Sequence, residues 1–402
     1  MKPAENLVAE APVLELDPFS HDYIVDPYPF HRQMRDAGPV VWLEPLGIWS
    51  VSRYAQVKAV LQDPETFCSG QGVGLSNFKV DEPWRPPSLL LETDPPRHTT
   101  NRAIISRLLS PATLKKLRET FEVEAALLVD QLIEREKFDA IPELAEAYPL
   151  KVFADAIGIR PDGRTKLIAY GNMVFNGMGP KNDLYRSAME NASAVSDWVW
   201  NACQRDALSP DGLGVQIFEA VDNNILTETE GAMLVRSFMS AGIDTTANAI
   251  GSALYCLSQY PQEWQKLRND PSLARATFEE TLRFESPFQT FFRTTTRETS
   301  ISGVALGANE KVMISLGSAN RDPDQWSEPE KFDITRSTIG HVGFGAGIHA
   351  CVGQMMARLE VEVVLRALAA KVASIEIDGP PRLHLHNTLR GYATLPIRLR
   401  AS

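Results

Sequence analysis

Residues 344–353 read Phe-Gly-Ala-Gly-Ile-His-Ala-Cys-Val-Gly and place Cys351 in a glycine-rich loop. Gly345 and Gly347 permit a positive φ and, lacking a Cβ atom, allow the backbone to lie close to a flat ligand. Apolar residues then recur at helical spacing over Gly353–Lys371, so a helix is expected to begin where the loop ends. Backbone N–H groups at that helix start should favour a thiolate over a thiol. The segment therefore predicts a cysteine that binds a metal.

A haem iron is the metal that we expect. A thiolate ligand favours O–O bond cleavage, whereas a histidine ligand serves O2 carriage or peroxidase chemistry. The alternative is a buried structural cysteine, the commoner role of a lone cysteine. Here Phe344, His349 and the glycines complete one pattern, Phe-Gly-x-Gly-x-His-x-Cys-x-Gly, which resembles the haem-binding signature of the cytochrome P450 family. The resemblance implies haem b with Cys351 as axial ligand, and a triangular helical prism with one long helix over the haem.

Composition and charge set broad limits. The chain has 402 residues, of which 44% are apolar and 23% charged, as in ordinary globular proteins. A net charge of −11 argues against nucleic acid or an anionic membrane surface as partner. The four cysteines are far apart, which indicates neither a zinc site nor a disulfide framework and favours the reducing cytoplasm. Asp244 and Asn248 interrupt the most apolar stretch, residues 240–257, so no membrane anchor is expected.

The pattern along the chain predicts a mainly α fold with a small β lobe. We expect a loose tail over residues 1–16 and one domain over residues 17–402. Helical periodicity follows a proline-punctuated loop at residues 70–96. Helices are expected over residues 54–62, 97–109, 112–135, 144–157, 183–203, 228–259, 262–269, 271–285 and 353–371. Strands are expected at residues 290–295, 304–306, 311–316, 375–377 and 395–399, with a hairpin at 40–52, so the β lobe would draw on about 40–53, 290–316 and 375–399.

The expected long helix 228–259 contains Ala241-Gly-Ile-Asp-Thr-Thr246. A glycine and an acid–threonine pair each cost helix stability, which suggests a functional reason for them. If the helix crosses the haem, Gly242 would make room for O2, Thr245 would donate through its hydroxyl and Asp244 would import protons. The alternative is a threonine that bonds back to a helix carbonyl beside a surface aspartate. The segment resembles the distal motif of the family, small-Gly-x-acid-Thr-Thr.

Two groups of charged residues are expected to support the haem site. Glu280 and Arg283 lie one helical turn apart, a spacing that usually makes a solvated surface pair of little energetic value. Their position, about seventy residues before the cysteine, resembles that of the Glu-x-x-Arg motif of the family, with Arg336 as third member, and implies a role in folding. Two haem carboxylates also need cations. Four residues resemble the propionate clamp of the family, although each alone is more often a surface charge: His98, Arg102, Arg293 and His349.

Residues 17–400 resemble the soluble bacterial branch of the family that oxidises para-substituted benzoic acids such as methoxybenzoates. Physically, Arg85 with Ser88, and Arg236 with Ser237, would supply positive potential and hydroxyl groups for a carboxylate. The alternative for both arginines is plain surface solvation. Ser237 precedes the distal threonine by eight residues, about 12 Å along a helix, which would present the para group to the iron. The other residues expected to contact substrate are Phe175, Met178, Ala241 and Phe291.

Met178 departs from that pattern, since close relatives tend to carry phenylalanine there. Methionine is flexible, so the size limit on the para substituent is less certain than in those relatives. The resemblance implies insertion of one oxygen atom from O2 into a small aromatic acid, by O-demethylation or hydroxylation. The alternatives are a terpenoid or fatty-acid substrate, a peroxide-using enzyme, and a haem-based sensor or carrier. The acid–threonine pair argues against peroxide use, because peroxide already carries the required electrons and protons.

Electrons are expected from an iron–sulfur ferredoxin and its NAD(P)H-dependent reductase. The chain has neither a flavin-binding pattern nor a cysteine pattern for an Fe–S cluster, so reducing equivalents must come from outside. An acidic ferredoxin would meet a basic patch on the cysteine side of the haem. The expected patch consists of Arg107, Lys115, Lys116 and Arg358.

Overall fold

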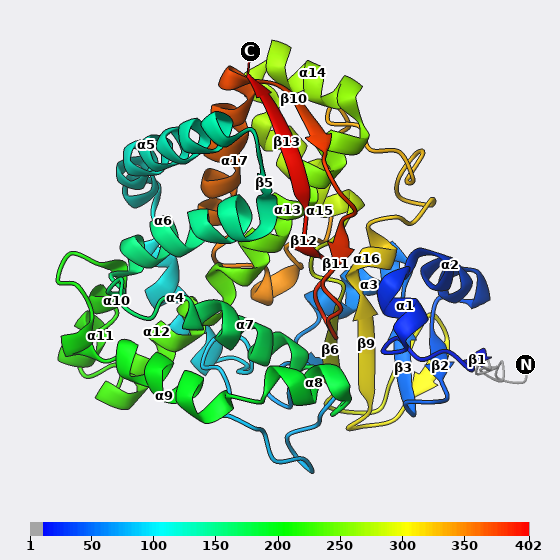
Figure 1. The fold of residues 1–402 in the computed structure, drawn as a ribbon. Helices are drawn as coiled ribbons and strands as arrows, with labels where there is room; N and C mark the ends of the chain where they lie inside the picture. The colour runs from blue at the N-terminus through cyan, green and yellow to red at the C-terminus, as the bar shows by residue number, and fades with distance from the viewer. Residues whose placement is uncertain (1–10, 402) are drawn as a thin grey trace, which may run out of the picture.

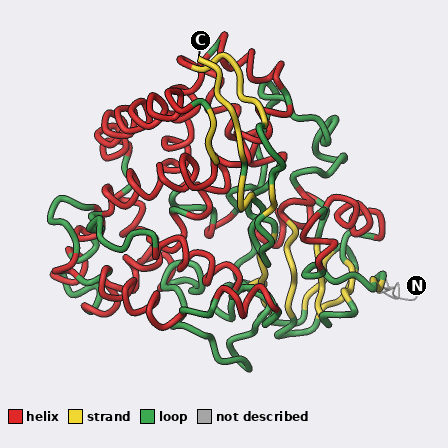
Figure 2. The backbone as a smooth tube through the Cα atoms, in the orientation of Figure 1, coloured by secondary structure: helices red, strands yellow, loops and turns green. Residues whose placement is uncertain are grey.

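The computed structural model describes residues 11–401 and confirms a mainly helical fold with small sheets (Figures 1 and 2). Most expected helices are present within one or two residues of their predicted ends. The helices are α1 (His21–Val25), α2 (Tyr28–Ala37), α3 (Tyr54–Gln62), α4 (Arg97–Leu108), α5 (Pro111–Arg135), α6 (Ala147–Ile157), α7 (Lys166–Asn176), α8 (Asp183–Ala188), α9 (Ala192–Ala202), α10 (Leu213–Gln216), α11 (Glu219–Asp222), α12 (Glu228–Gly242), α13 (Asp244–Gln259), α14 (Pro261–Asn269), α15 (Ala274–Phe284), α16 (Leu316–Ala319) and α17 (Gln354–Lys371).

The largest sheet has six strands in the order β1-β2-β3-β9-β6-β4 and lies at the right of Figure 1. Its strands are β1 (Val13–Leu14), β2 (Val41–Leu43), β3 (Ile48–Val51), β4 (Phe67–Cys68), β6 (Thr290–Thr295) and β9 (Lys311–Ser315). All five residues of β9 are buried, and β9 pairs in parallel with β3 and antiparallel with β6. Strand β6 thereby carries Phe291 and Arg293 to the boundary between this sheet and the helices. A separate hairpin joins β7 (Thr299–Ile301) to β8 (Val304–Leu306).

The C-terminal strands do not join this sheet, so their assignment to one β lobe was wrong. Strands β10 (Val372–Ile377), β13 (Pro396–Ala401) and β5 (Lys137–Asp139) form a second sheet among α5, α14 and α17 at the top of Figure 1. Val372 and Ile397 explain this position, because both are fully buried in the helical core. A third pair consists of β11 (Arg382–Leu383) and β12 (Tyr392–Thr394).

The expected loose tail over residues 1–16 also needs correction. Val13 and Leu14 form β1, which pairs in parallel with β2 through Trp42 and Leu43. Residues 1–10 lie outside the described part of the chain. An isolated two-residue strand has no recognisable alternation, so only its partner strand identifies it.

The expected helix over residues 228–259 is interrupted above the site. Its first part, α12, begins with a capping box in which Thr227 and Glu230 bond to each other's backbone N–H groups. It ends at Gly242, and α13 restarts at Asp244 after Ile243, whose φ and ψ are −98° and −62°. The glycine and the acid–threonine pair that marked this segment in the sequence therefore coincide with a break in the helix.

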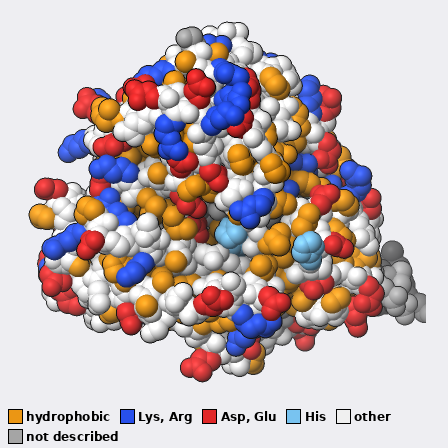
Figure 3. Space-filling view, viewed as in Figure 1, with side chains coloured by type: hydrophobic (Ala, Val, Ile, Leu, Met, Phe, Trp, Pro, Cys, Tyr) orange, Lys and Arg blue, Asp and Glu red, His pale blue; other side chains and the backbone are white. Residues whose placement is uncertain are grey.

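Helix α13 packs against α15 and α17, and α17 packs against α5. A six-residue π-helix, Ile141–Glu146, precedes α6 and also packs on α13. No helix within residues 11–401 is long and apolar enough to cross a membrane. Acidic and basic side chains are interspersed over the face seen in Figure 3.

Candidate functional site

One cavity brings together most of the residues predicted from separate parts of the sequence. We call it the inner cavity, and it lies between the cysteine loop, α12, the start of α13 and β6. Of the residues predicted to contact the haem, O2 or the substrate, or to deliver protons, four do not line it: His98, Met178, Arg236 and Asp244. Those that do are Arg85, Ser88, Arg102, Phe175, Ser237, Ala241, Gly242, Thr245, Phe291, Arg293, Phe344, Gly345, His349, Cys351 and Gly353.

The cysteine loop has the backbone geometry that its glycines predict. Gly345 and Gly347 have φ values of +70° and +69°. A Cβ atom on Gly347 would lie 2.3 Å from the carbonyl oxygen of Leu61, so only glycine fits there. The backbone N–H of Cys351 donates to the carbonyl of Phe344 at 2.8 Å and closes the loop. The thiol is thus fixed at the wall of the inner cavity.

The ionisation of Cys351 differs from the sequence-based expectation. Burial raises the pKa of its thiol, while the N–H group of Gly353 and the charges of Arg102 and Arg358 lower it. Burial is the largest of these effects, so the helix start alone does not secure a thiolate. A bound metal ion would do so, because its positive charge favours the deprotonated sulfur.

Four basic side chains converge on one edge of the cavity. The rings of His98 and His349 lie 4.1 Å apart between centroids, and the Nε2 atom of each is buried with no hydrogen-bond partner within residues 11–401. Burial, followed by the nearby charge of Arg293, lowers the pKa of His349 to about 2. Burial also lowers the pKa of Arg293 to about 10, and its guanidinium donates to the carbonyl of Phe292 at 2.8 Å.

This edge fits the two carboxylates of a haem. Neither Arg102 nor Arg293 forms an ion pair within the described residues 11–401. Two imidazoles that each bury an unpartnered Nε2 atom, beside two arginines without an ion-pair partner within residues 11–401, are unfavourable unless a ligand compensates them. Haem propionates would supply both the negative charge and the missing hydrogen-bond acceptors.

At the helix break, Thr245 has the geometry of the alternative stated above, a threonine that bonds back to a carbonyl of its own helix. Its hydroxyl donates to the carbonyl of Ala241 at 2.7 Å, one turn back along the helix. The space left by Gly242 accommodates the ring of Phe153, because a Cβ atom there would lie 2.1 Å from Cζ of that ring. The glycine therefore permits close packing of α6 against α12.

Asp244 is not the surface aspartate of that alternative. A Cβ atom on Gly171 would lie 2.4 Å from Oδ2 of Asp244, so the carboxylate packs directly against α7. Burial and, next, the charge of Glu146 raise the pKa of Asp244 well above its ordinary value. Glu146 ends the π-helix beside α13, and burial raises its pKa too. Asp244 thus points away from the inner cavity, toward a second carboxyl group.

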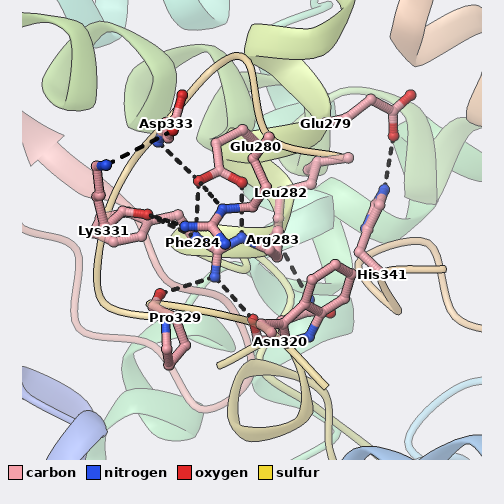
Figure 4. A network of polar contacts seen from close by, with 12 residues as sticks. Glu279, Glu280, Leu282, Arg283, Phe284, Asn320, Pro329, Lys331, Asp333 and His341 are labelled. Atoms are coloured by element: carbon pink, nitrogen blue, oxygen red, sulfur yellow. Dashed lines mark hydrogen bonds and ion pairs between the residues drawn. The ribbon is translucent and has the colours of Figure 1, made fainter. Parts of the chain in front are cut away.

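Glu280 and Arg283 form a fully buried ion pair (Figure 4). The two Arg283–Glu280 hydrogen bonds measure 2.7 and 2.8 Å, and Arg283 also donates to the carbonyls of Asn320 and Pro329. Arg336 reaches the same glutamate, with 3.4 Å between Nε and Oε1. The alternative of a solvated surface pair is therefore wrong for Glu280 and Arg283. Together with Arg336 they connect α15 to the segment that leads into the cysteine loop.

Glu279, which the sequence reasoning missed, connects that network to the loop. It pairs with His341 at 2.7 Å and with Arg358, whose guanidinium also lies 4.5 Å from the ring centroid of Phe344. The side chain of Arg358 is only 13% exposed. Its assignment to a free basic docking patch was therefore wrong, because its charge is already compensated.

The opposite end of the cavity carries the predicted serines. The hydroxyl of Ser88 donates to that of Ser237 at 2.9 Å, although 149 positions separate them in the chain. Arg85 also lines the cavity, but Nη1 and Nη2 are paired with Glu92 at 2.9 and 3.3 Å. The alternative that Arg85 is simply a solvent-exposed surface arginine is therefore wrong. Glu92 was missed, because an irregular loop has no periodicity that would predict which charges meet.

Two predicted substrate contacts lie elsewhere. Arg236 is buried and donates to the carbonyls of Pro86 and Pro87, so it braces the loop rather than facing the cavity. Met178 lines a separate outer cavity, and its carbonyl accepts a hydrogen bond from Leu75 at 2.8 Å. The chain turns after α7 to make this bond, which carries Met178 away from the inner cavity.

Phe288 is a further wall residue that the sequence reasoning did not single out. Its ring stacks on Phe291, with centroids 4.1 Å apart and an interplanar angle of 10°. It also meets the edge of Phe175 at 5.5 Å. All three rings line the inner cavity and form an apolar wall suited to a flat substrate. Glu360 of α17 was missed as well; burial raises its pKa well above the ordinary value.

Comparison with known proteins agrees with this arrangement. The family model described as Cytochrome P450 matches residues 210–370. The chain is 55% identical to cytochrome P450 CYP199A2 of Rhodopseudomonas palustris, over 97% of this chain and 95% of that protein. It is 33% identical to cytochrome P450 107B1 of Saccharopolyspora erythraea, over 88% and 89% of the two chains. The solved structure of cytochrome P450 CREJ in complex with (4-ethylphenyl) dihydrogen phosphate has a TM-score of 0.87 and 25% identity, covering 96% of this chain and 99% of that one.

The fold and the site thus define a haem monooxygenase. The chain belongs to the cytochrome P450 family. Haem is accordingly its cofactor.

Proposed function

We propose that this cytochrome P450 oxidises the para substituent of a small aromatic carboxylic acid, by O-demethylation or hydroxylation. The proposed substrate is a para-substituted benzoate, for example 4-methoxybenzoate. The observation that carries the proposal is the pair of hydroxyls of Ser88 and Ser237, 2.9 Å apart beside Arg85 in the cavity that also contains Cys351 and Thr245.

The cysteine loop and the basic edge would hold the haem. Cys351 would bind the iron, and Phe344, Gly345, Gly353 and Gly242, which line the same cavity, would surround the macrocycle. The propionates would lie at the basic edge formed by His98, Arg102, Arg293 and His349. Bound there, the haem supplies activation of O2, of which one atom enters the substrate and the other leaves as water.

The chain would orient the substrate from its carboxylate end. Hydrogen bonds from hydroxyl and guanidinium groups to a carboxylate are charge-assisted and stronger than those between neutral groups. Phe175 and the stacked pair Phe288 and Phe291 would enclose the aromatic ring. Ser237 lies on α12 and Thr245 in the first turn of α13, eight residues further along the chain, so the para group would face the cysteine side of the cavity.

Asp244 and Thr245 would move protons from the side of α7 and the π-helix toward the inner cavity. The raised pKa of Asp244 favours its protonated form more than in a surface aspartate, as suits a group that takes up and passes on a proton. The hydroxyl of Thr245 lines the cavity and, by rotating away from the carbonyl of Ala241, can donate toward the haem.

A solved structure offers independent support for the substrate class. The ligand of cytochrome P450 CREJ, (4-ethylphenyl) dihydrogen phosphate, is a para-substituted arene with an acidic group at the opposite end. A carboxylate in place of the phosphate gives the geometry proposed here. Oxidation of a terpenoid or a fatty acid is the alternative function for the same fold, since cytochrome P450-terp is 27% identical over 92% of this chain.

The electron donor would be an iron–sulfur ferredoxin with its NAD(P)H-dependent reductase in the cytoplasm. Arg107, Lys115 and Lys116 are exposed, and none forms an ion pair within residues 11–401. They would form the basic contact for an acidic ferredoxin, without Arg358. The four cysteines are all unpaired, which suits a reducing compartment.

Equilibrium binding tests the substrate class. The haem-loaded protein is titrated with 4-methoxybenzoate, 4-methoxybenzamide and the methyl ester, and the shift of the Soret band toward high spin gives each Kd. We expect the acid to bind at least about ten-fold more tightly than either neutral analogue, since a charge-assisted hydrogen bond contributes roughly 1.5–3 kcal/mol. Equal binding of acid, amide and ester would contradict the proposal and favour a neutral hydrophobic substrate.

A further inference from the structure

Arg85 and Glu92 differ in which cavities they line, and only Arg85 faces the inner cavity, where the substrate would bind. Arg85 lines both the inner cavity and the outer cavity, which is formed by residues 74–85 with the end of α7 and the start of α8. Glu92 lines only the outer cavity. The side chains of Arg85 and Glu92 are 11% and 6% exposed, so the pair forms part of the wall between the two cavities. A substrate in the inner cavity would meet Arg85 without contacting Glu92.

The carboxylate of Glu92 holds two of the groups proposed to bind the substrate carboxylate. It accepts hydrogen bonds from Nη1 and Nη2 of Arg85 and from the backbone N–H of Ser88, the last at 2.6 Å. Nη1 of Arg85 also donates to the carbonyl of Pro86 at 2.9 Å. The Nε atom of Arg85 is buried and has no acceptor within residues 11–401. The Ser88 hydroxyl already donates to Ser237, and the Ser237 hydroxyl donates to the carbonyl of Met233, each at 2.9 Å. The donor left without an acceptor is thus Nε of Arg85, and either hydroxyl would rotate to donate to a substrate.

The same carboxylate also reduces the positive potential of the site. The charge of Arg85 is compensated by Glu92 at ion-pair distance. Arg236, the other nearby arginine, donates only to backbone carbonyls of the loop and has no acidic partner within the described part of the chain. A substrate anion is therefore attracted by Arg236 at a distance and repelled by Glu92.

We propose that Glu92 is a positioning residue for the substrate carboxylate, and that its charge sets how strongly the site prefers anions. It keeps Arg85 and Ser88 in place and weakens the attraction between the site and a carboxylate. This inference rests on the proposed function, because it concerns the same carboxylate.

Two substitutions separate the two effects. Glu92→Gln keeps an acceptor oxygen for Arg85 and Ser88 and removes the negative charge, so we expect 4-methoxybenzoate to bind at least about five-fold more tightly than in the wild type. The Kd of the neutral 4-methoxybenzamide should stay within about two-fold. Glu92→Ala also removes the acceptor, so both ligands should bind at least about five-fold more weakly than to Glu92→Gln. Glu82→Gln is the matched control, because Glu82 lines the outer cavity and forms no ion pair within residues 11–401; both Kd values should be unchanged.

The titrations use the haem-loaded protein and its spin-state shift. If Glu92→Gln leaves the Kd of the acid unchanged, or tightens acid and amide equally, the inference is overturned. A wild-type protein that does not distinguish acid from amide would instead overturn the proposed function. Should Glu92→Gln fail to bind haem, the double variant Arg85→Gln with Glu92→Gln is compared with Arg85→Gln alone, so that only the charge of Glu92 differs between the two. The double variant should bind the acid at least about five-fold more tightly than Arg85→Gln and the amide within about two-fold, and equal acid binding by the two variants would contradict the inference.

Discussion

The carboxylate of Glu279 lies between His341 and Arg358, 2.7 Å from Nε2 of the histidine and 3.2 Å from Nη2 of the arginine. His341 precedes the cysteine loop and Arg358 follows it. One side chain of α15 therefore joins both ends of the segment that contains Cys351. Glu280, the next residue, pairs with Arg283, which donates to the carbonyls of Asn320 and Pro329 (Figure 4). It also pairs with Arg336 and so anchors the same helix to the preceding segment.

Glu279→Gln should destabilise the protein in a pH-dependent way. Burial raises the pKa of Glu279, but the hydrogen bonds from His341 and Arg358 lower it to about 2, from an ordinary 4.5. Such a depressed pKa adds stability that is fully present above about pH 4.5 and is lost as the pH falls toward 2. We expect a loss of up to about 3 kcal/mol at pH 7 that shrinks as the pH drops below 4.5.

Thermal unfolding midpoints of the wild type and Glu279→Gln, measured from pH 7 down to pH 3.5, check this expectation. Glu122→Gln is the control, because Glu122 pairs with Arg118 on the exposed face of α5 at 3.4 Å. Its effect should be below about 1 kcal/mol at every pH. A difference between wild type and Glu279→Gln that stays constant over the whole range would contradict the role given to the charge of Glu279.

Cys351→Ala should abolish thiolate ligation of the haem. The reduced wild-type protein with carbon monoxide should show the strongly red-shifted Soret band of a thiolate haem, and the variant should not. Cys256→Ala removes a buried cysteine on α13, outside the inner cavity, and should keep the band. An imidazole-type spectrum in the wild type would contradict the ligand assignment.

Asp244 and Thr245 should control different aspects of turnover. Thr245→Ala should retain substrate binding and NAD(P)H consumption but divert electrons to hydrogen peroxide, whereas Thr245→Ser should restore most of the coupling because it keeps the hydroxyl. Asp244→Asn should slow turnover, because its amide cannot pass on a proton. Product and peroxide per NAD(P)H are measured with a reconstituted ferredoxin system. Full rate and coupling in both Thr245→Ala and Asp244→Asn would show that the pair moves no protons.

The sequence predicted some periodic elements with accurate ends, but the expected helix over residues 183–203 is divided into α8 and α9, and α7 was not expected. Strand β6 at Thr290–Thr295 and helix α3 at Tyr54–Gln62 were predicted with the ends that the structure has, since each shows a clear pattern. The break at Ile243 and the burial of Asp244 were not predicted, because helical periodicity continues through both. They depend on packing against α7 and the π-helix, which are far away in the sequence.

At the substrate end, the sequence identified Ser88 and Ser237 but not their environment. Glu92 and Phe288 were missed because both lie in irregular segments, where spacing does not say which side chains meet. Arg358 was assigned to a free surface because its partner, Glu279, comes from another helix. Contacts between segments distant in the chain are the part that composition and periodicity leave open.

The most direct test of the proposed activity is the product of one reaction. The haem-loaded protein, supplied with a bacterial ferredoxin, its reductase and NADH, is incubated with 4-methoxybenzoate and with 2-methoxybenzoate, and the products are identified by chromatography and mass spectrometry. We expect 4-hydroxybenzoate and formaldehyde in equal amounts from the para isomer, and at least about ten-fold less product from the ortho isomer, because the carboxylate and the iron would lie at opposite ends of the ring. Preferred oxidation of the ortho isomer, or no oxidation of the para isomer in a system that oxidises a neutral terpenoid or a fatty acid, would contradict the account.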